Sequence, residues 1–279
     1  MPELPEVETI ARELNAKVPR RRIDRIEIFR DDALVGVPRK GFRAALEGRT
    51  IRECSRRGKL LIFHLAPERY LVSHLRMTGK FALSEPLAAP LPHHRLWFHL
   101  DDGTLLVYQD LRCFGTLEVV DRLADARSLA KLGIDPLSRR FNAAWLGAAL
   151  AGSRTPLKHW LMDQSRIAGL GNIYASEILY AAGISPETPS HWLDRDGVER
   201  LVSETRRILR KAIEKNGTTI SDFRRVDEKM GEFQNFLRVY GKEGDPCPRC
   251  HTPIVRIRQQ QRSTFFCPAC QPLPQFPAA

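Results

Sequence analysis

CPRCHTPIVRIRQQQRSTFFCPAC, residues 247–270, organises the C-terminal part of the chain. It contains two Cys-x-x-Cys pairs, Cys247 with Cys250 and Cys267 with Cys270, at a spacing typical of a zinc ribbon. Each pair can present two thiolates to one tetrahedral ion, and four cysteines leave no coordination position open. The sequence therefore predicts one structural Zn²⁺ and no organic cofactor, with two disulfides or free thiols as the alternative.

The segment between the cysteine pairs has the pattern of a β-hairpin, because two alternating runs flank a polar tip. Arg256 and Arg258 share one face of it, and Arg262 follows the tip. Arginines on a zinc-stapled hairpin suit contact with a nucleic-acid groove or with phosphates. A solvated basic hairpin that contacts other proteins is the alternative.

Helical signals precede this segment. One helix is expected to start at Thr155 and Pro156 and to end at Gly169, a second covers 172–182 before Gly183, and a third covers 197–216 before Gly217. They indicate a helical middle part of the chain.

Further toward the N-terminus, residues 23–120 consist of short β-type runs separated by turn signals such as Asp102-Gly103. Residues 4–15 carry apolar side chains at helical spacing. We therefore expect an α+β protein that begins with a mostly antiparallel sandwich or barrel and its leading helix. A composition shift at 132–138 and the Pro-, Cys- and Arg-rich composition of roughly the last 40 residues give three expected domains, at 1–131, 132–236 and 237–279.

Charge and composition restrict the class of partner. The chain has 279 residues, with 44 Lys and Arg against 33 Asp and Glu, and a net charge of +11, which favours a polyanion such as nucleic acid. The start, MPELPEVE, lacks the pattern of a signal peptide, and no apolar run approaches the ~18 residues of a membrane span. We expect a soluble, cytoplasmic protein with no membrane partner, in which Cys54 and Cys113 are unpaired thiols.

The N-terminus carries a group that can react as a nucleophile. Once Met1 is removed, Pro2 carries a secondary amine whose pKa, about 7.7 to 8.0 for an α-amino group, leaves part of it unprotonated at neutral pH. Such an amine attacks carbonyl-like carbons to give an iminium, and Glu3 and Glu6 follow at a spacing that places both carboxylates near it. The alternative is an ordinary helix start, where Pro and Glu are common.

Motifs along nearly the whole chain resemble those of formamidopyrimidine-DNA glycosylases, base-excision enzymes that remove oxidised purines. They are PELPEVET (2–9), RRGKLLIFHL (56–65), HLRMTG (74–79), DLRCFG (110–115), LMDQSRIAGLGNIYASEIL (161–179), GTTISDF (217–223), VYGKEGDPCPRC (239–250) and RSTFFCPACQ (262–271). The resemblance implies an N-terminal β-sandwich with a leading helix, a helix-two-turn-helix module and a zinc finger.

The resemblance also implies a reaction that joins glycosylase and lyase steps. Pro2 is the implied nucleophile at the deoxyribose C1′, and Glu3 is the implied acid, with Glu6 beside them. Base loss then gives a covalent iminium, followed by β- and δ-elimination. Lys59 is the implied proton donor for the first elimination and Arg262 for the second, although both residue types are also ordinary phosphate binders.

A base inside a duplex cannot reach such a site, so the enzyme must extrude it and fill the space left behind. The resemblance assigns the filling to Met77, Arg112 and Phe114 and further contacts with double-stranded DNA to His93, Arg154, Lys158, Asn172 and Tyr240. Asn172 is expected to be both the N-cap of its helix and a phosphate ligand. The implied partner is DNA with oxidised bases or abasic sites, bound by a monomer, with association to the bacterial nucleoid as needed.

Three departures from the family pattern stand out. Cys113 occupies a position where a basic residue is usual, Arg95 stands where a second histidine often follows His93, and Ile220 and Ser221 lie at the variable tip of GTTISDF. None of them affects Pro2, Glu3 or the cysteines.

Two other functions stay open. A catalytically silent zinc protein that binds damaged DNA needs only the basic surface, the zinc and the wedge residues, whereas Pro2, Glu3, Glu6 and Lys59 together favour an enzyme. An endonuclease VIII-like enzyme for oxidised pyrimidines is the second, and Met77 with Phe114 argues against it.

Overall fold

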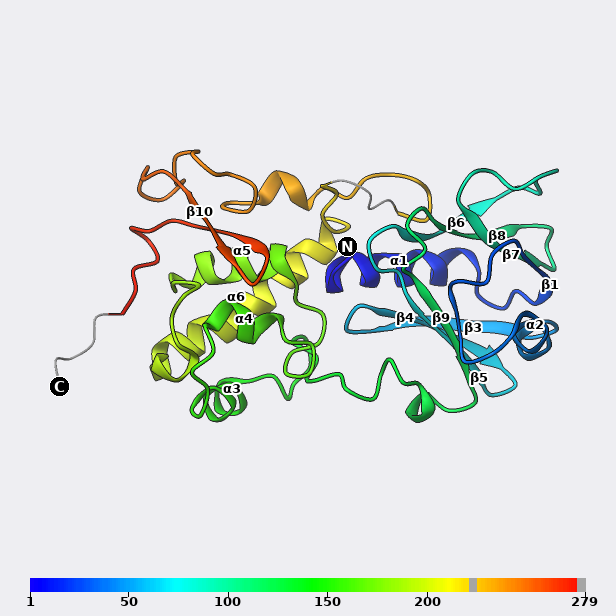
Figure 1. Ribbon diagram of the computed structural model, residues 1–279, viewed down its shortest axis with the longest axis horizontal. Coiled ribbons are helices and arrows are strands. Elements are labelled where there is room, and N and C mark those ends of the chain that lie inside the picture. Colours follow the sequence, from blue (N-terminus) through cyan, green and yellow to red (C-terminus); the bar gives the residue numbers. More distant parts are fainter. Residues whose placement is uncertain (221–224, 275–279) are drawn as a thin grey trace. The chain divides into compact units, whose positions relative to one another are not determined.

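The computed structural model describes residues 1–220 and 225–274. Its contacts divide the chain into two compact units, Met1–Lys131 with Ile213–Gln234, and Leu132–Ala212 with Asn235–Ala279. Figure 1 shows that the first unit carries two sheets, and the second carries helices and a C-terminal hairpin. The expected α+β class is confirmed.

The first unit contains nine strands and two α-helices within the described residues. In chain order they are α1 (Leu4–Lys17), β1 (Ile23–Ile28), β2 (Leu34–Val35), α2 (Arg39–Leu46), β3 (Thr50–Arg57), β4 (Leu60–Ala66), β5 (Arg69–His74), β6 (Gly79–Ser84), β7 (His94–Leu100), β8 (Leu105–Asp110) and β9 (Thr116–Val120), followed by the 3₁₀ turn η1 (Leu123–Asp125).

These strands form a four-stranded sheet in the order β1-β7-β8-β6 and a five-stranded sheet in the order β2-β9-β5-β4-β3. All pairs are antiparallel except β2 with β9. The two sheets share one hydrophobic core, in which Phe63 of β4 meets Phe81 of β6 with ring centroids 5.1 Å apart. The expected sandwich is therefore confirmed, because both inner faces bury their alternating apolar residues together.

Helix α1 buries its apolar stripe, including Ile10 and Leu14, in the same core. Its Asn15 side chain exchanges two hydrogen bonds of 2.6 Å with the backbone of Cys54 on β3. Val226 also enters this core, and its backbone N–H donates to Glu13 at 2.8 Å. The leading helix is thus fixed against the five-stranded sheet, and this fixes the position of the N-terminal residues that precede the helix.

Helix α2 differs from the expectation of strands throughout 23–120. Only Phe42 and Leu46 are buried on its eight residues, so its apolar signal is short. Pro38 is its N-cap and has extended backbone angles, φ −74° and ψ 166°.

The second unit contains α3 (Ala143–Leu150), α4 (Leu157–Met162), α5 (Asn172–Ala182), η2 (Ser190–Trp192), most of α6 (Arg195–Glu214), η3 (Phe233–Phe236), β10 (Val255–Gln259) and β11 (Arg262–Phe266). η3 begins at the end of the first unit. The hairpin β10–β11 and helix α5 agree with the expectation, with Gly183 left-handed at φ +69°. Helix α6 lies two residues earlier than expected at each end.

Helix α4 is shorter than expected, because it ends at Met162 and not near Gly169. The Asp163 carboxylate accepts the backbone N–H of Ser165 at 2.9 Å, a side-chain turn that competes with the helix. Helix α3 was not expected at all. Its N-cap Asn142 accepts the N–H of Trp145 at 2.9 Å.

Within the residues that the structure describes, no helix combines the length and the apolar character needed to cross a membrane.

Candidate functional site

The N-terminal residues are held by a reciprocal cap on α1. The Glu3 side chain accepts from the backbone of Glu6, and Glu6 Oε2 accepts from the Glu3 N–H at 2.8 Å. Both carboxylates are buried, and Pro2 is buried beside them, whereas Met1 is 40% exposed. The cap fixes the position of the Pro2–Glu3 pair relative to the helix.

Glu6 also contacts the segment that follows α6. Its Oε1 accepts the backbone N–H of Thr218 at 2.7 Å. Gly217 has φ +77°, and a Cβ there would lie 2.9 Å from Glu6 Oε1. Because both oxygens accept backbone N–H groups, Glu6 is suited to positioning the N-terminus and less suited to exchanging protons.

Lys59 lies in the turn between β3 and β4 and is 5% exposed. It acts electrostatically on His74, which is at the end of β5 opposite Leu60. Burial, together with the smaller effect of the Arg76 and Lys59 charges, lowers the pKa of His74 to about 3. His74 Nδ1 accepts the N–H of Arg76 at 3.1 Å, so the neutral ring carries its proton on Nε2.

Sequence reasoning missed His74 as a site residue. His74 is the first residue of the HLRMTG motif and could have been singled out there. The motif alone does not show that the side chain is buried, and burial is what keeps the ring neutral.

Met77, Arg112 and Phe114 lie on two loops of the first unit, one between β5 and β6 and the other between β8 and β9. Met77 is 38% exposed and Phe114 is 54% exposed. The Arg112 guanidinium lies over the Phe114 ring, 4.9 Å from its centroid. The three predicted wedge residues therefore project from one sandwich as solvent-exposed side chains.

His93 is exposed at φ +72° just before β7, and its carbonyl accepts the N–H of Asp110 at 3.0 Å. His93 thus lies at the base of the Arg112 loop. Of the tip residues Ile220 and Ser221, Ile220 is 54% exposed, and Ser221 lies outside the described residues.

In the second unit, three predicted contacts meet at the first residues of β11, next to the hairpin tip. Lys158, 1% exposed, donates from Nζ to Thr264 Oγ1 at 2.6 Å and to the Ser263 carbonyl at 3.1 Å. Asn172 Nδ2 donates to the same carbonyl at 2.9 Å and to the Tyr240 hydroxyl at 3.4 Å. Lys158, Asn172 and Tyr240 therefore connect α4 and α5 with β11.

The expectation that Asn172 is an N-cap is wrong. Gly171 is the N-cap and Asn172 is the first helical residue. The physical reason is that the Asn172 amide is already engaged by the hairpin carbonyl and by Tyr240, so it does not turn back to cap its own helix.

Glu177 on α5 is a residue that sequence reasoning missed. Its buried carboxylate accepts the backbone N–H groups of Arg238, Val239 and Tyr240 at 2.8 to 3.1 Å. Burial raises its pKa, and those three N–H groups oppose the shift. The contact spans positions 61 to 63 residues apart, which is why no local pattern indicated it.

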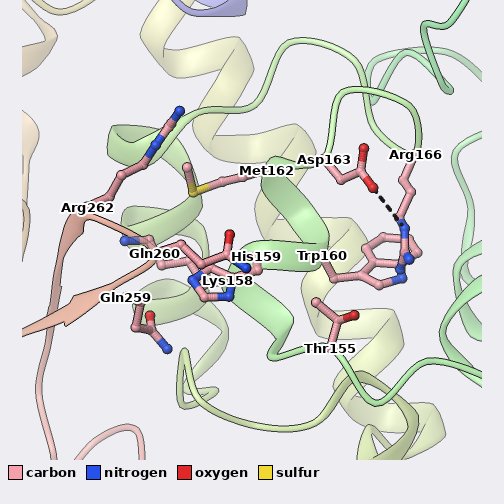
Figure 2. Close-up of a pocket in the computed structure, with 10 residues that line it drawn as sticks. All are labelled: Thr155, Lys158, His159, Trp160, Met162, Asp163, Arg166, Gln259, Gln260 and Arg262. Atoms are coloured by element: carbon pink, nitrogen blue, oxygen red, sulfur yellow. Dashed lines mark ion pairs between the residues drawn. The ribbon is translucent and has the colours of Figure 1, made fainter.

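A cavity of about 390 Å³ lies between α4 and the hairpin tip; Figure 2 shows the residues that line it. Arg262 and the tip residues Gln259 and Gln260 line one side, and Trp160 with Arg166 lines the other. Arg166 pairs with Asp163 at 3.2 Å and lies 5.2 Å above the Trp160 ring.

His159 lies between these sides of the cavity. Burial lowers its pKa, as do the charges of Lys158 and Arg262. The cavity is therefore a cationic recess with Arg262 at its rim. Arg154 is exposed in the loop before α4.

The four C-terminal cysteines form one cluster whose Sγ atoms lie within 4.8 Å of one another. The separations of 3.8 Å for Cys247–Cys270 and 3.4 Å for Cys250–Cys267 and Cys250–Cys270 are far longer than a disulfide bond of about 2.05 Å. Tetrahedral Zn–S bonds of about 2.3 Å require Sγ atoms about 3.8 Å apart. This donor set fits a structural Zn²⁺, and the disulfide alternative is excluded. The other two cysteines, Cys54 and Cys113, are unpaired thiols, as expected.

The zinc module is attached to the C-terminal end of α5. Arg249 donates to the carbonyls of Tyr180 and Ala181 at 2.9 and 3.0 Å, a favourable place for a cation. Burial raises the pKa of the Cys247 thiol, but hydrogen bonds from the Tyr180 hydroxyl and from backbone N–H groups outweigh it and lower the pKa to about 6. These contacts favour the thiolate that a metal needs.

Three family models match the chain. The formamidopyrimidine-DNA glycosylase N-terminal domain matches residues 1–117, the formamidopyrimidine-DNA glycosylase H2TH domain matches 132–224, and the zinc finger found in FPG and IleRS matches 244–273. The curated formamidopyrimidine-DNA glycosylase of Symbiobacterium thermophilum is 44% identical, over 99% of this chain and 90% of that protein. That of Streptococcus thermophilus is 41% identical, over 97% and 99%.

Solved structures of FPG proteins superimpose on nearly the whole of this chain. A variant of Lactococcus lactis FPG in complex with Fapy-dG containing DNA superimposes with a TM-score of 0.91 at 36% identity, over 97% of this chain and 100% of that one. The MutM (FPG) protein of Thermus thermophilus gives a TM-score of 0.87 at 40% identity, over 98% and 100%.

Proposed function

Since the chain belongs to the formamidopyrimidine-DNA glycosylase family, we propose that it is a base-excision repair enzyme with glycosylase and abasic-site lyase activities. Its substrates are oxidised purines, 8-oxoguanine and formamidopyrimidines, in double-stranded DNA. The relatives' names and the Fapy-dG complex of the Lactococcus lactis protein support this substrate class.

The observation that carries the proposal is the buried pair of Pro2 and Glu3, fixed by the reciprocal cap with Glu6. Removal of Met1, which a small second residue permits, frees the Pro2 amine. That amine attacks C1′ of the damaged nucleotide, the glycosidic bond breaks, and the base leaves with its electron pair and a proton. Glu3 is the acid that assists opening of the sugar ring, and the product is a charged iminium between Pro2 and C1′.

The iminium acts as an electron sink for two eliminations. Loss of the C2′ proton expels the 3′ phosphate, and a second elimination expels the 5′ phosphate; hydrolysis of the iminium then returns the Pro2 amine. We assign proton donation in the first elimination to Lys59. Arg262 serves the second elimination by positioning phosphate, because its guanidinium stays protonated.

We assign extrusion of the damaged base to Met77, Arg112 and Phe114. A flexible thioether occupies the vacated space, the guanidinium donates to the orphaned base and the aromatic ring wedges the stack. We assign further DNA contacts to His93, Arg154, Lys158, Asn172 and Tyr240, with Asn172 as a phosphate ligand. The exposed Met77 and Phe114 and the net charge of +11 support these roles.

In terms of the three expected segments, 1–131 carries Pro2, Glu3, Lys59 and the wedge residues, 132–236 contributes DNA contacts, and 237–279 contributes DNA contacts together with Arg262. The zinc ion holds the hairpin in shape and takes no part in the chemistry, because its four thiolates leave no open position. As a repair enzyme of the chromosome, the protein is placed in the bacterial cytoplasm, at the nucleoid when it works, and acts as a monomer.

The test is a set of end-labelled duplexes that carry 8-oxoguanine, a formamidopyrimidine, an oxidised pyrimidine or an abasic site. We expect cleavage on both sides of the oxidised purines and of the abasic site, and its loss in Pro2→Gly with DNA affinity largely retained. Tight binding without any cleavage would identify a silent damage-binding protein, and preference for the pyrimidine would identify an endonuclease VIII-like enzyme. Either result would overturn the proposal.

A further inference from the structure

The two loops that carry the wedge residues are joined by one buried carboxylate. Asp110, the last residue of β8, is 1% exposed. Its Oδ1 accepts the Thr78 hydroxyl of the Met77 loop at 2.5 Å and the backbone N–H of Arg112 at 3.2 Å, and its Oδ2 accepts the N–H of Gly115 at 2.7 Å. One side chain thus contacts the start and end of its own loop and the neighbouring loop.

Thr78 completes the connection from the other side. Its hydroxyl oxygen accepts the Arg112 N–H at 3.0 Å while its proton is donated to Asp110. The backbone of Arg112 therefore belongs to this hydrogen-bonded cluster, and Met77 is next to it through Thr78.

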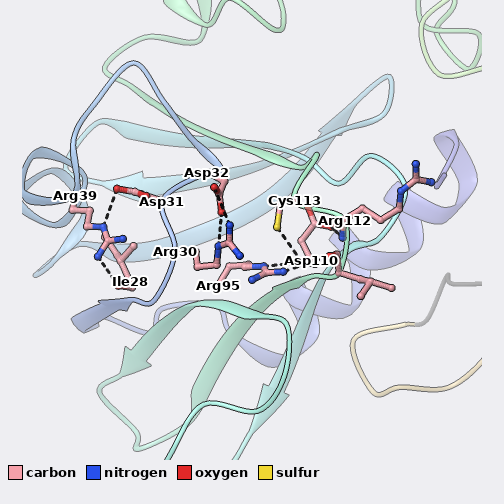
Figure 3. A network of polar contacts seen from close by, with 10 residues as sticks. Ile28, Arg30, Asp31, Asp32, Arg39, Arg95, Asp110, Arg112 and Cys113 are labelled. Carbon is pink, nitrogen blue, oxygen red and sulfur yellow. Dashed lines mark hydrogen bonds and ion pairs between the residues drawn. The ribbon is translucent and has the colours of Figure 1, made fainter.

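Arg95 supports the loop from within the sheet. It is 8% exposed, and its Nε donates to the Asp110 carbonyl at 2.7 Å while another guanidinium nitrogen reaches the Leu111 carbonyl at 3.5 Å. Figure 3 shows Arg95 and Asp110 side by side, with the Cys113 sulfur directed at the same Asp110 carbonyl. Two of the three departures from the family pattern, Arg95 and Cys113, therefore meet at this point.

Close packing leaves these loops little freedom. A Cβ on Gly115 would lie 1.9 Å from the Tyr108 hydroxyl, and a Cβ on Gly79 would lie 2.5 Å from the Leu75 carbonyl and 2.9 Å from the same hydroxyl. Both loops thus end in glycines pressed against one buried tyrosine.

We propose that Asp110 is a positioning residue for base extrusion, which sets the Met77 loop and the Arg112–Phe114 loop in a fixed mutual register through Thr78, with Arg95 supporting the carbonyl side. This inference rests on the proposed function, because it takes the three exposed side chains as the wedge. Loops that are already ordered lose less conformational freedom when they enter the duplex, so the bonds of Asp110 lower the cost of extrusion.

The experiment separates extrusion from chemistry. Cleavage of 8-oxoguanine paired in a duplex requires extrusion, whereas cleavage of an abasic site in a single-stranded oligonucleotide does not. We expect Thr78→Val to lower kcat/KM on the duplex about 10- to 100-fold and to leave single-strand cleavage within about twofold of wild type. Thr78→Ser, which keeps the hydroxyl, should restore duplex cleavage.

Asp110→Asn provides a second test, because its amide replaces one of the two acceptor oxygens with a donor, so that either the Gly115 side or the Thr78–Arg112 side loses its acceptor. It should show the same selective loss, and 2-aminopurine beside the lesion should report less unstacking. Equal loss on both substrates, or no loss on either, in folded Thr78→Val would overturn the inference. Failure of the proposed function is distinguishable in the wild-type protein, because a silent damage-binding protein would cleave neither substrate and an endonuclease VIII-like enzyme would cleave the abasic site but not the 8-oxoguanine duplex.

Discussion

Glu6 and Thr218 lie 212 positions apart in the sequence and are joined by a hydrogen bond of 2.7 Å from the Thr218 N–H to Glu6 Oε1. The other Glu6 oxygen holds the N–H of Glu3 at 2.8 Å. One carboxylate therefore connects the N-terminal residues with the segment after α6. The geometry of the proposed nucleophile depends on this connection, which passes beside Gly217.

Gly217→Ala should destabilise the protein more than Gly48→Ala. The two glycines have nearly the same backbone angle, φ +77° and +78°, but an added Cβ meets Glu6 at 2.9 Å at Gly217 and nothing within 4 Å at Gly48. Gly48→Ala therefore reports the backbone strain alone, about 1 kcal/mol. Urea unfolding should give Gly217→Ala at least about 1 kcal/mol more, together with slower strand cleavage. Equal losses in the two variants would show that Glu6 is not sterically fixed.

His74 should make the protein less stable as the pH falls below 6.5. Burial lowers its pKa from 6.5 to about 3, so on acidification the unfolded chain takes up a proton at His74 before the folded chain does. The contribution of the neutral ring to the free energy of unfolding is therefore complete above pH 6.5 and declines toward pH 3. His74→Asn, which keeps an acceptor for the Arg76 N–H, should flatten the unfolding free energy between pH 6.5 and 4. Burial also lowers the pKa values of His64, His94 and His159, so some slope remains.

The control for that measurement is His191→Gln, at an exposed position. It should keep the wild-type pH dependence. A His74→Asn curve parallel to that of wild type would contradict a buried neutral His74.

Glu177→Leu should destabilise the second unit strongly, because it removes a buried carboxylate that accepts three backbone N–H groups, one of them on buried Val239. We expect a loss of about 3 kcal/mol or more in urea unfolding, and about 1 kcal/mol for Glu177→Gln, whose carbonyl oxygen still accepts. DNA affinity should fall in parallel, since Tyr240 is one of the three residues held. Exposed Glu187→Leu is the matched control, and equal effects at the two glutamates would refute the account of Glu177.

Removal of zinc should unfold the C-terminal module and weaken DNA binding. Structural zinc supplies folding free energy to such a module, and Lys158 and Asn172 both hydrogen-bond to the hairpin that it holds. After chelation, protease cleavage within 244–273 should accelerate, and readdition of Zn²⁺ should reverse it. Full DNA affinity in protein shown by mass spectrometry to be metal-free would exclude the hairpin from the interface.

Local sequence patterns were sufficient to predict those elements whose stabilising residues lie close together in the sequence. The Cys-x-x-Cys pairs, the alternating hairpin and the 172–182 helix with its glycine stop each contain their own determinants. Helices α2 and α3 were missed because only two side chains are buried on each, too few to form a periodic pattern. Asn142 before α3 was nevertheless a readable cap signal.

The family resemblance supplied the candidate site residues, but the contacts that position them could not be predicted from sequence. Glu177 acts on Val239 62 residues away, and Thr78 acts on Asp110 32 residues away. Such pairs follow from the packing of whole elements. The same reason explains why Asn172 is held by the hairpin and does not cap its own helix.

Covalent trapping tests the central claim most directly. The purified protein is incubated with a duplex that carries 8-oxoguanine opposite cytosine, borohydride is added, and the protein–DNA adduct is mapped by mass spectrometry. We expect one adduct on Pro2, in chains that lack Met1, and its absence in Pro2→Gly. No adduct from protein that lacks Met1 and binds the duplex tightly, or an adduct on a lysine such as Lys59, would contradict the assignment of Pro2 as the nucleophile.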